Sequence, residues 1–360
     1  TLTHSCGDPS AIYPHTSTHP GDSMKIRELI IPEPDRIDLV DGDLDDTLAP
    51  HEVLVETEFS IVSAGTEGAG FTGLVKQMPF GDAGQYPRGT GYGNLGRVLA
   101  VGSGGTGCSV GDRVLSFSRH ATHVKADSRR MVLPMPDGPG DHLAFTRMAG
   151  VSISAVRSSS VQPGDSVLVI GAGLVGNFAA QLFRLAGADV ALADLSDLRL
   201  ERARQCGIEN TCNAASQDIE GFVKKWTGDR GARISVEAIG ISEVVAQAVA
   251  CTATHGEVIL LGSPRMPAVF DVTPMLLRIH LQAIRMIGAL EWRWPQHETE
   301  RSRDLDANYR QLARWIADGR LIIEPLLTHR ASPTDCQQIY DGLTGRREEY
   351  LGAVFDWTMV

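Results

Sequence analysis

The sequence predicts an α/β protein in which a glycine-rich β-domain is joined to a doubly wound parallel sheet with helices on both faces. Short alternating apolar runs, separated by Gly, Pro and Asp, fill the first third of the chain. Strand and helix patterns then alternate through its centre. The chain has 360 residues, which is enough for two or three domains at about 150 residues each.

The N-terminal region has the pattern of short strands and tight turns. Alternating runs predict its strands, over residues 25–31, 52–58 and 96–101, and a turn at 111–112 leads into a further strand. Glycine is dense from residue 65 to residue 111, and glycine permits the tight turns of a compact β-domain. We therefore expect a β-rich unit that starts near residue 24.

The central region changes to a helical period over 141–160, and a Pro-Gly-Asp turn at 163–165 ends it. Strand and helix patterns alternate after this turn, which implies a parallel sheet. The expected strands are 166–170, 189–193, 234–237, 257–261 and 284–287, and the expected helices are 176–186, 197–206 and 242–250. A helix over 308–318 and strands over 326–330 and 351–357 follow, and we expect this tail to rejoin the N-terminal domain, because the doubly wound sheet is complete without it.

Charge and cysteine usage disfavour several classes of protein. Lys+Arg number 33 and Asp+Glu number 44, so the net charge of −11 argues against a nucleic-acid or anionic-membrane partner. No apolar run approaches the ~20 residues of a membrane-spanning helix. The six cysteines are scattered without a C-x-x-C pair, which favours a reducing compartment. We expect a soluble, cytoplasmic protein.

The first 23 residues are predicted to be a flexible N-terminal extension. They are rich in Ser, Thr, His, Pro and Gly, and they lack the charged start and apolar stretch of a secretory signal. A metal site is conceivable here from His4, Cys6, His15 and His19, but the composition favours a polar tail.

A glycine-rich loop stands between the strand at 166–170 and the helix that follows it. Its G-x-G-x-x-G pattern is formed by Gly171, Gly173 and Gly176, with Leu174 and Val175 between the last two. The first glycine allows a tight turn, the second lets backbone N–H groups approach a pyrophosphate, and the third lets helix and strand pack closely. The alternative is a glycine-rich turn alone, but the strand before and the helix after it favour a Rossmann-type dinucleotide site.

An acidic residue follows at the place where such a site binds the adenosine ribose. Asp194 ends the next strand, 18 residues after Gly176, and its carboxylate suits a ribose diol. The same carboxylate repels a 2′-phosphate, so NAD is favoured over NADP. Arg199 leaves NADP possible, since it lies either over the adenine or on a solvated helix face.

The order of segments resembles the medium-chain dehydrogenase/reductase superfamily, the relatives of zinc alcohol dehydrogenase. The segments that carry the resemblance are 161–173, Glu237 to Gly240, His255 to Gly262 and Asp318 to His329, and the likeness covers about residues 24–357. It implies a GroES-like catalytic domain from 24–150 and 291–360, a Rossmann domain from 151–290, and a cleft between them. It also implies a homodimer or homotetramer and adds Gly240 and Gly262 to the cofactor-binding residues.

The zinc ligands of these relatives are missing at the matching positions. Ala64 stands where the first ligand is a Cys, Tyr92 replaces the His of a G-H-E motif, and Ala149 matches the third ligand. Alanine cannot coordinate zinc. The four-Cys structural lobe is also absent, and a rebuilt site would have to come from His51, His120, His123 or Glu67. We expect no zinc, as in a zinc-less branch similar to bacteriochlorophyllide and sugar-pathway dehydrogenases.

Without zinc, side chains must move the proton and stabilise charge on the substrate oxygen. The candidate catalytic residues are Thr66, Glu67, Tyr92 and His120. The resemblance makes Thr66 a proton relay and places Tyr92 in the cleft. Glu67 is a candidate base if it is partly desolvated, and His120 titrates near neutrality.

Each candidate also has a structural interpretation. Glu67 pairs with Arg88 or Arg97, Tyr92 is a packing aromatic, and His120 lies on the surface of a strand, as His123 does. Thr66 caps a helix, which is compatible with a relay.

The segment Trp292, Arg293 and Trp294 follows the last strand of the nucleotide domain. Two tryptophans beside an arginine are unusual in an exposed loop. They form either a substrate wall or a subunit contact. Arg293 suits an anionic or polyhydroxylated substrate, or else it is a surface arginine.

The favoured function is a zinc-independent NAD(P)-dependent oxidoreductase acting on a secondary alcohol or ketone of a polar small molecule, such as a sugar, cyclitol or biosynthetic intermediate. One alternative is an NADPH-dependent reductase of activated C=C bonds, against which Asp194 counts. The other is a nucleotide-sensing protein without catalysis, against which Thr66, Glu67 and Tyr92 count.

Overall fold

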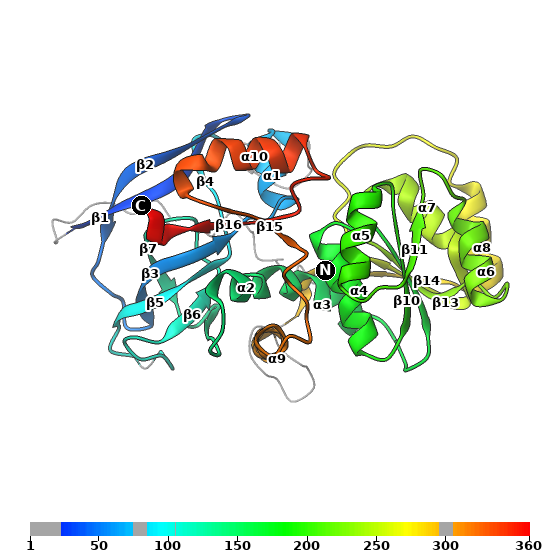
Figure 1. Cartoon of the computed structure of the whole chain (residues 1–360), viewed down its shortest axis with the longest axis horizontal. Helices are drawn as coiled ribbons and strands as arrows, with labels where there is room; N and C mark the ends of the chain where they lie inside the picture. The colour runs from blue at the N-terminus through cyan, green and yellow to red at the C-terminus, as the bar shows by residue number, and fades with distance from the viewer. Residues whose placement is uncertain (1–22, 75–84, 105, 295–304) are drawn as a thin grey trace, which may run out of the picture.

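The computed structural model describes residues 23–74, 85–104, 106–294 and 305–360, with the side chain of Arg293 left out. These residues form two lobes, one built on a parallel sheet and one on mainly antiparallel strands (Figure 1). The candidate tail residues His4, Cys6, His15 and His19 lie outside the described residues. Within the described part, no helix combines the length and the apolar character needed to cross a bilayer.

The first lobe contains a six-stranded parallel sheet in the order β11-β10-β9-β12-β13-β14. The order runs outward in both directions from β9, which confirms the predicted doubly wound sheet. Its strands are β9 (Ser166–Ile170), β10 (Asp189–Asp194), β11 (Asn210–Asn213), β12 (Ala232–Glu237), β13 (Thr252–Leu260) and β14 (Arg285–Gly288).

Helices cover both faces of this sheet, α4 and α5 on one side and α6, α7 and α8 on the other (Figure 1). The helices are α4 (Leu174–Leu185), α5 (Asp197–Gln205), α6 (Ile219–Thr227), α7 (Ser242–Cys251) and α8 (Thr273–Gln282). Separate clusters of buried side chains lie on the two faces. Parallel strands buried on both faces need near-continuous apolar runs, such as Val167 to Ile170.

The second lobe contains a seven-stranded sheet, β15-β16-β3-β5-β6-β8 with β7 paired to β3, and a three-stranded sheet, β2-β1-β4. Its strands are β1 (Ser23–Glu33), β2 (Arg36–Asp45), β3 (Glu52–Ile61), β4 (Arg88–Gly89), β5 (Asn94–Val101), β6 (Arg113–Ser116), β7 (His123–Asp127), β8 (Val132–Pro134), β15 (Leu327–Ala331) and β16 (Gly352–Asp356). β16 runs antiparallel to β3, so the tail rejoins the N-terminal strands as predicted.

Short helices complete the second lobe and its connection to the first. They are α1 (Thr66–Phe71), α2 (Gly140–Ala144), α3 (Thr146–Ser158), α9 (Leu305–Ala317) and α10 (Cys336–Gly345), with single 3₁₀ turns at η3 (Glu291–Arg293), η4 (Pro333–Asp335) and η5 (Trp357–Met359). The predicted domain boundary at residue 150 falls within α3, and the one at 290 falls between β14 and η3. The division into domains stays a prediction.

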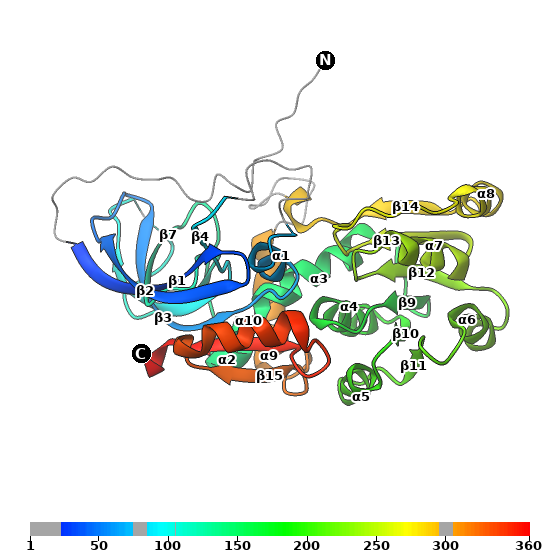
Figure 2. The same cartoon turned by 90° about the horizontal axis from the view of Figure 1, so that it is seen from above.

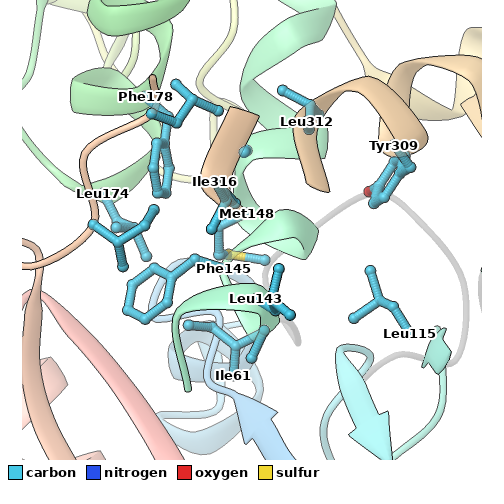
Figure 3. Close-up of a cluster of buried hydrophobic side chains, with 14 of the residues drawn as sticks. Ile61, Leu115, Leu143, Phe145, Met148, Leu174, Phe178, Tyr309, Leu312 and Ile316 are labelled. Carbon is cyan, nitrogen blue, oxygen red and sulfur yellow. The ribbon is translucent and has the colours of Figure 1, made fainter. Parts of the chain in front are cut away.

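The two lobes share a hydrophobic junction centred on α3. Phe145 and Met148, at the start of α3, pack with Phe178 of α4 and with Leu312 of α9 (Figure 3). The same buried cluster reaches Ile61 and other residues of the second lobe. This shared core holds the C-terminal end of β3 near the C-terminal end of β9. The candidate site lies at these two strand ends.

Candidate active site

The loop between β9 and α4 has the geometry of a phosphate cradle. Gly171 has a φ of +107°, and a Cβ on Gly176 would lie 1.8 Å from the Gly171 carbonyl oxygen. Gly173 caps α4 without a side-chain hydrogen bond, and a Cβ built on it meets nothing within 4 Å. The open backbone and the unpaired N–H groups of the first helical turn, Leu174 and Val175 included, fit an anionic pyrophosphate.

Two further glycines lie where the neighbouring strands end. Gly240 has a φ of +88°, and a Cβ on Gly262 would lie 2.2 Å from the Gly240 backbone nitrogen. The loops after β12 and β13 therefore touch each other through glycine backbone, beside the loop that holds Gly171. Residues of three adjacent strand ends fit a dinucleotide at this edge of the sheet.

Asp194 ends β10 and is held against the glycine-rich loop. Its two carboxylate oxygens accept hydrogen bonds from the backbone N–H groups of Ala172 (2.6 Å) and Ser196 (2.9 Å). The sequence alone allowed two positions for the Arg199 side chain, over the adenine or on a solvated helix face. The structure instead shows its guanidinium donating to the carbonyl of Arg347 in the second lobe (2.6 Å), with Asp194 at 3.9 Å.

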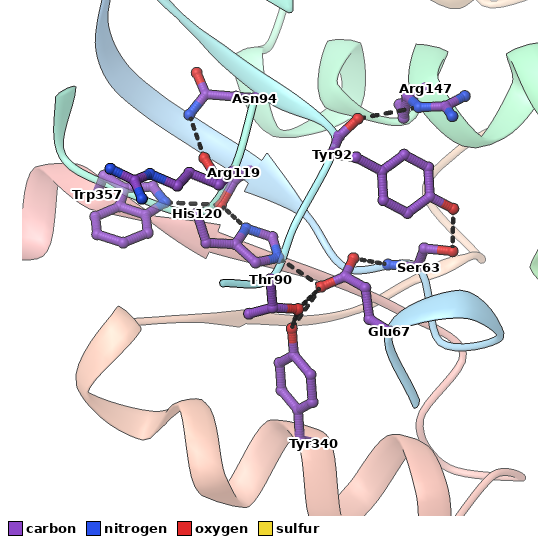
Figure 4. Close-up of polar contacts among 11 residues, drawn as sticks. Ser63, Glu67, Thr90, Tyr92, Asn94, Arg119, His120, Arg147, Tyr340 and Trp357 are labelled. Carbon is purple, nitrogen blue, oxygen red and sulfur yellow. Dashed lines mark hydrogen bonds and ion pairs between the residues drawn. The ribbon is translucent and has the colours of Figure 1, made fainter. Parts of the chain in front are cut away.

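A pair of hydroxyl groups lies where the second lobe meets this edge. The Tyr92 hydroxyl donates to Ser63 Oγ at 2.5 Å, and Ser63 lies between β3 and α1 (Figure 4). Burial raises the pKa of Tyr92, and the cation of Arg147 opposes this shift. Thr66 is exposed and begins α1, but Gly65 is the cap residue and Thr66 provides no side-chain cap, so the capping interpretation is wrong.

Arg147 is a fully buried cation beside Tyr92. Its guanidinium carbon lies 4.4 Å from the Tyr92 ring centre and 4.2 Å from that of Phe117, and Nε donates to the Tyr92 carbonyl at 3.1 Å. Nη1 donates to both carboxylate oxygens of Glu291, at 2.9 and 3.0 Å, and also contacts the Tyr309 hydroxyl. Burial opposes the charge on Arg147, but Glu291 holds its pKa above the usual value.

Glu67 and His120 form a second buried network behind the first. His120 Nε2 lies 3.0 Å from Glu67, and its Nδ1 lies 2.7 Å from Ser60 (Figure 4). The Glu67 carboxylate also accepts from Tyr340 (2.5 Å), Thr90 (2.8 Å) and the Ser63 N–H (2.7 Å). Burial favours the neutral acid, but His120 and these hydrogen bonds lower the pKa of Glu67.

These contacts correct two expectations about the network. Glu67 pairs with His120 and not with Arg88 or Arg97, and Arg97 pairs with Glu58. His120 is completely buried, so it is not a strand-surface histidine, whereas His123 is partly exposed on β7. Because every polar atom of Glu67 and His120 has a partner, the two residues hold the Ser63 turn against α10.

The residues present do not fit a zinc ion. Ala64 and Ala149 offer no ligand atoms, and the Tyr92 hydroxyl is taken up by Ser63. Within residues 23–74, 85–104, 106–294 and 305–360, no three His, Cys, Asp or Glu side chains gather in a group that could hold a metal. The side-chain polar atoms of His120 and Glu67 are taken up by partners within the protein.

Trp292 and Trp294 lie near the buried arginine. Trp292 is half exposed, and its ring meets Phe117 edge-on, with 5.6 Å between the ring centres. Trp294 is partly buried against the junction core. The backbone of Arg293 belongs to η3, and its side chain lies outside the described part. The choice between substrate wall and subunit contact stays open.

The sequence did not single out Ser63, Arg147, Glu291 or Arg265. Arg147 carried a detectable signal, since it is a charged residue among the apolar positions of a predicted helix. Glu291 lies 144 residues away, and no local pattern pairs the two. Arg265, in the loop after β13, donates to the Gly65 carbonyl across the junction between the lobes.

Sequence relatives of the chain are dehydrogenases. The family model described as zinc-binding dehydrogenase matches residues 175–302. Sorbitol dehydrogenase 2 of Saccharomyces cerevisiae is 25% identical over 289 residues, which cover 70% of this chain and 76% of the relative.

Solved structures with the same fold cover 92% of this chain and 99% of their own. Galactitol-1-phosphate dehydrogenase from Escherichia coli has a TM-score of 0.79 at 19% identity. An alcohol dehydrogenase from Escherichia coli CFT073, complexed with NADH, has a TM-score of 0.76 at 17% identity. Part of the chain is thus similar in sequence to the zinc-binding dehydrogenases, and the whole chain shares the fold of alcohol dehydrogenases of known structure.

Proposed function

We propose that the protein is a zinc-independent NAD(P)-dependent oxidoreductase that interconverts a secondary alcohol and a ketone in a polar small molecule. The observation that supports this most strongly is the Tyr92–Ser63 hydroxyl pair, because the resemblance matches Tyr92, and Ala64 next to Ser63, to metal ligands of zinc relatives. Relatives named for sorbitol and galactitol phosphate favour a polyol, cyclitol or sugar. The catalytic role falls to Tyr92 with Ser63 and Thr66, while Glu67 and His120 act as positioning residues.

Tyr92 is the proton donor and acceptor in this proposal. Because burial keeps its pKa raised, the phenol is protonated at neutral pH and can donate to a carbonyl oxygen as that oxygen gains negative charge. Donation leaves a phenolate, which the hydroxyls of Ser63 and Thr66 and the cation of Arg147 stabilise. In the opposite direction this phenolate accepts the proton of the alcohol and becomes the neutral phenol again.

The cofactor is held by the loops at the ends of the parallel strands. The residues that would hold it are Gly171, Gly173, Leu174, Val175, Gly176, Asp194, Gly240 and Gly262. The nicotinamide, when bound, supplies or accepts the hydride. Arg199 acts at the junction between the lobes through the Arg347 carbonyl, so it is not a free partner for a 2′-phosphate. We propose NAD as the preferred cofactor.

A deuterium-transfer experiment tests the reaction class. Protein is incubated with C4-deuterated NADH and a panel of polar ketones, sugar ketones and enones, and the products are examined by mass spectrometry. We expect deuterium at the carbinol carbon of the alcohol that is formed from a ketone. Label at a carbon that belonged to the C=C bond of an enone, or no transfer from either face of the cofactor across the panel, would contradict the proposal.

Replacing Asp194 with Ser tests the cofactor preference. The change removes the carboxylate that repels a 2′-phosphate, so NADPH should bind at least 10-fold more tightly and NADH several-fold more weakly. Titration of cofactor fluorescence measures both dissociation constants. An exposed aspartate on β2, Asp41→Ser, is the control. Unchanged selectivity in the Asp194 variant would contradict the assignment.

The edge of the parallel sheet is the place where we propose a second copy of this chain binds. The helix α8 buries none of its residues, and Leu276, Leu277 and Leu281 on it are more than half exposed. Within the described residues, β14 pairs on one side only, with β13. An apolar face beside an open strand edge suits a second copy related by a two-fold axis, since each copy covers the other's edge.

Light scattering after gel filtration tests this contact. We expect the wild type to have about twice the chain mass of 38.8 kDa, and we expect Leu281→Glu to reduce the mass to that of one chain. The matched control is Leu198→Glu, which changes an exposed leucine on α5. A monomeric wild type, or a variant that stays dimeric, would refute the contact.

A further inference from the structure

The loop after β13 carries an arginine that crosses the junction between the lobes. This loop leaves the parallel sheet and extends toward α1 before it returns to α8 (Figure 1). Arg265 Nη1 donates to the Gly65 carbonyl, and Nη2 lies 3.5 Å from Thr66 Oγ1. The guanidinium of a nucleotide-lobe residue is therefore held beside the hydroxyl groups of the second lobe.

Arg265 is a half-buried cation, and among the described residues no carboxylate forms an ion pair with it. The phenol of Tyr92 is the ionisable group that acts on the pKa of Arg265. Burial lowers the pKa of Arg265, because the charge has lost part of its water without gaining an opposite charge. By contrast, Arg147 on the other side of Tyr92 is neutralised by Glu291. Arg265 thus brings a positive charge without a paired carboxylate to the hydroxyl group of Thr66.

We propose that Arg265 is the anion-recognition residue of the active site and that the substrate carries a carboxylate or phosphate group close to the carbinol carbon. A guanidinium binds either group through two parallel hydrogen bonds and completes its charge balance. The inference rests on the proposed function, since it places the anion beside the Tyr92 hydroxyl. It narrows the substrate to an acidic polyol, a hydroxy acid or a sugar phosphate.

The dinucleotide's own pyrophosphate is the other possible source of an anion. The open backbone at Gly173 already provides a cradle for that group, whereas the guanidinium of Arg265 donates to Gly65 and Thr66 on the opposite lobe. These contacts favour the substrate as the source.

Binding of small anions to the cofactor-loaded protein tests the proposal without any turnover. Inorganic phosphate and malonate are titrated calorimetrically into wild type, Arg265→Gln, Arg265→Lys and Arg320→Gln, each saturated with NAD+. Arg320 is an exposed arginine paired with Asp318 and serves as the control. We expect at least one probe to bind the wild type and the control equally, with a loss of 10-fold or more in Arg265→Gln and a smaller loss in Arg265→Lys.

Three results would overturn the proposal. They are no binding of either probe to the wild type, equal binding to Arg265→Gln, and a 10-fold weaker NAD+ affinity in Arg265→Gln, which would assign the guanidinium to the pyrophosphate. The same titration on Tyr92→Phe separates the two proposals. Normal anion binding there supports the Arg265 site even if the turnover of that variant contradicts the role of Tyr92.

Discussion

Replacing Tyr92 with Phe is expected to reduce kcat for ketone reduction by about 10² to 10⁴-fold, the usual contribution of a positioned general acid. The ring still packs against Arg147, but the hydroxyl that donates to the substrate oxygen is lost. The dissociation constant of NADH should change by less than about two-fold, because the glycine-rich loop is untouched. Stopped-flow single turnovers and fluorescence titration measure the two quantities.

A matched tyrosine provides the control for this variant. The Tyr350 hydroxyl accepts a hydrogen bond from Arg346 at 2.8 Å, in the C-terminal segment, and Tyr350→Phe should keep kcat near the wild-type value. Turnover by Tyr92→Phe at the wild-type rate would show that Tyr92 only packs. Equal losses in both variants would point to a general loss of folding.

Replacing Arg147 with Met is expected to lower the free energy of unfolding by about 3–5 kcal/mol, since the buried Glu291 carboxylate loses its ion-pair partner. Chemical denaturation measures this value. The double variant Arg147→Met, Glu291→Leu leaves no uncompensated charge, so its loss should be smaller than that of the single variant. If the double variant lost as much free energy of unfolding as the two single variants lose together, Arg147 and Glu291 would not be a coupled pair.

Removing Arg147 and removing Glu291 should shift the pH profile of ketone reduction in opposite directions. Reduction requires the protonated phenol of Tyr92, so the rate is full below the pKa of Tyr92 and falls as the pH rises through that pKa. Arg147 lowers this pKa, so its removal should move the alkaline limb to higher pH. Glu291→Gln leaves Arg147 uncompensated and should move the limb to lower pH. Shifts in the same direction would indicate a structural role alone.

Local patterns predicted the nucleotide-binding lobe well. A buried strand such as β9 or a capped helix such as α5 is specified by residues a few positions apart, so period and turn chemistry suffice. The weaker elements were missed for a physical reason. The edge strand β11 contains Asn210-Thr-Cys-Asn, which has little apolar alternation, and α8 buries none of its residues, so it shows no core-facing stripe.

The second lobe depends more on long-range pairing. The strand β2 alternates charged and apolar residues but is recognisable only through its register with β1. The helix α10 packs against α1 and β2, about 270 to 300 residues earlier, through contacts such as Tyr340 with Glu67. Such contacts are set by the folded chain, and no local window contains them.

The sequence predicted which types of residue form the candidate site, but it did not predict which of these residues pair with each other. The missing zinc ligands and the place of Tyr92 follow from motif positions. The pairing of Glu67 with His120 and of Arg147 with Glu291 does not, because a buried charge chooses its partner through tertiary packing. For that reason arginines near Glu67 in sequence were plausible but wrong partners.

Metal content combined with activity tests the central claim, that side chains and not a metal ion polarise the substrate oxygen. Protein purified without chelators is analysed by mass spectrometry for zinc and then assayed before and after dialysis against 1,10-phenanthroline. We expect less than one-tenth of a zinc ion per chain on this account, since the matching positions hold Ala64, Tyr92 and Ala149, with unchanged turnover after dialysis. One zinc ion per chain, whose removal abolishes turnover and whose return restores it, would contradict the account.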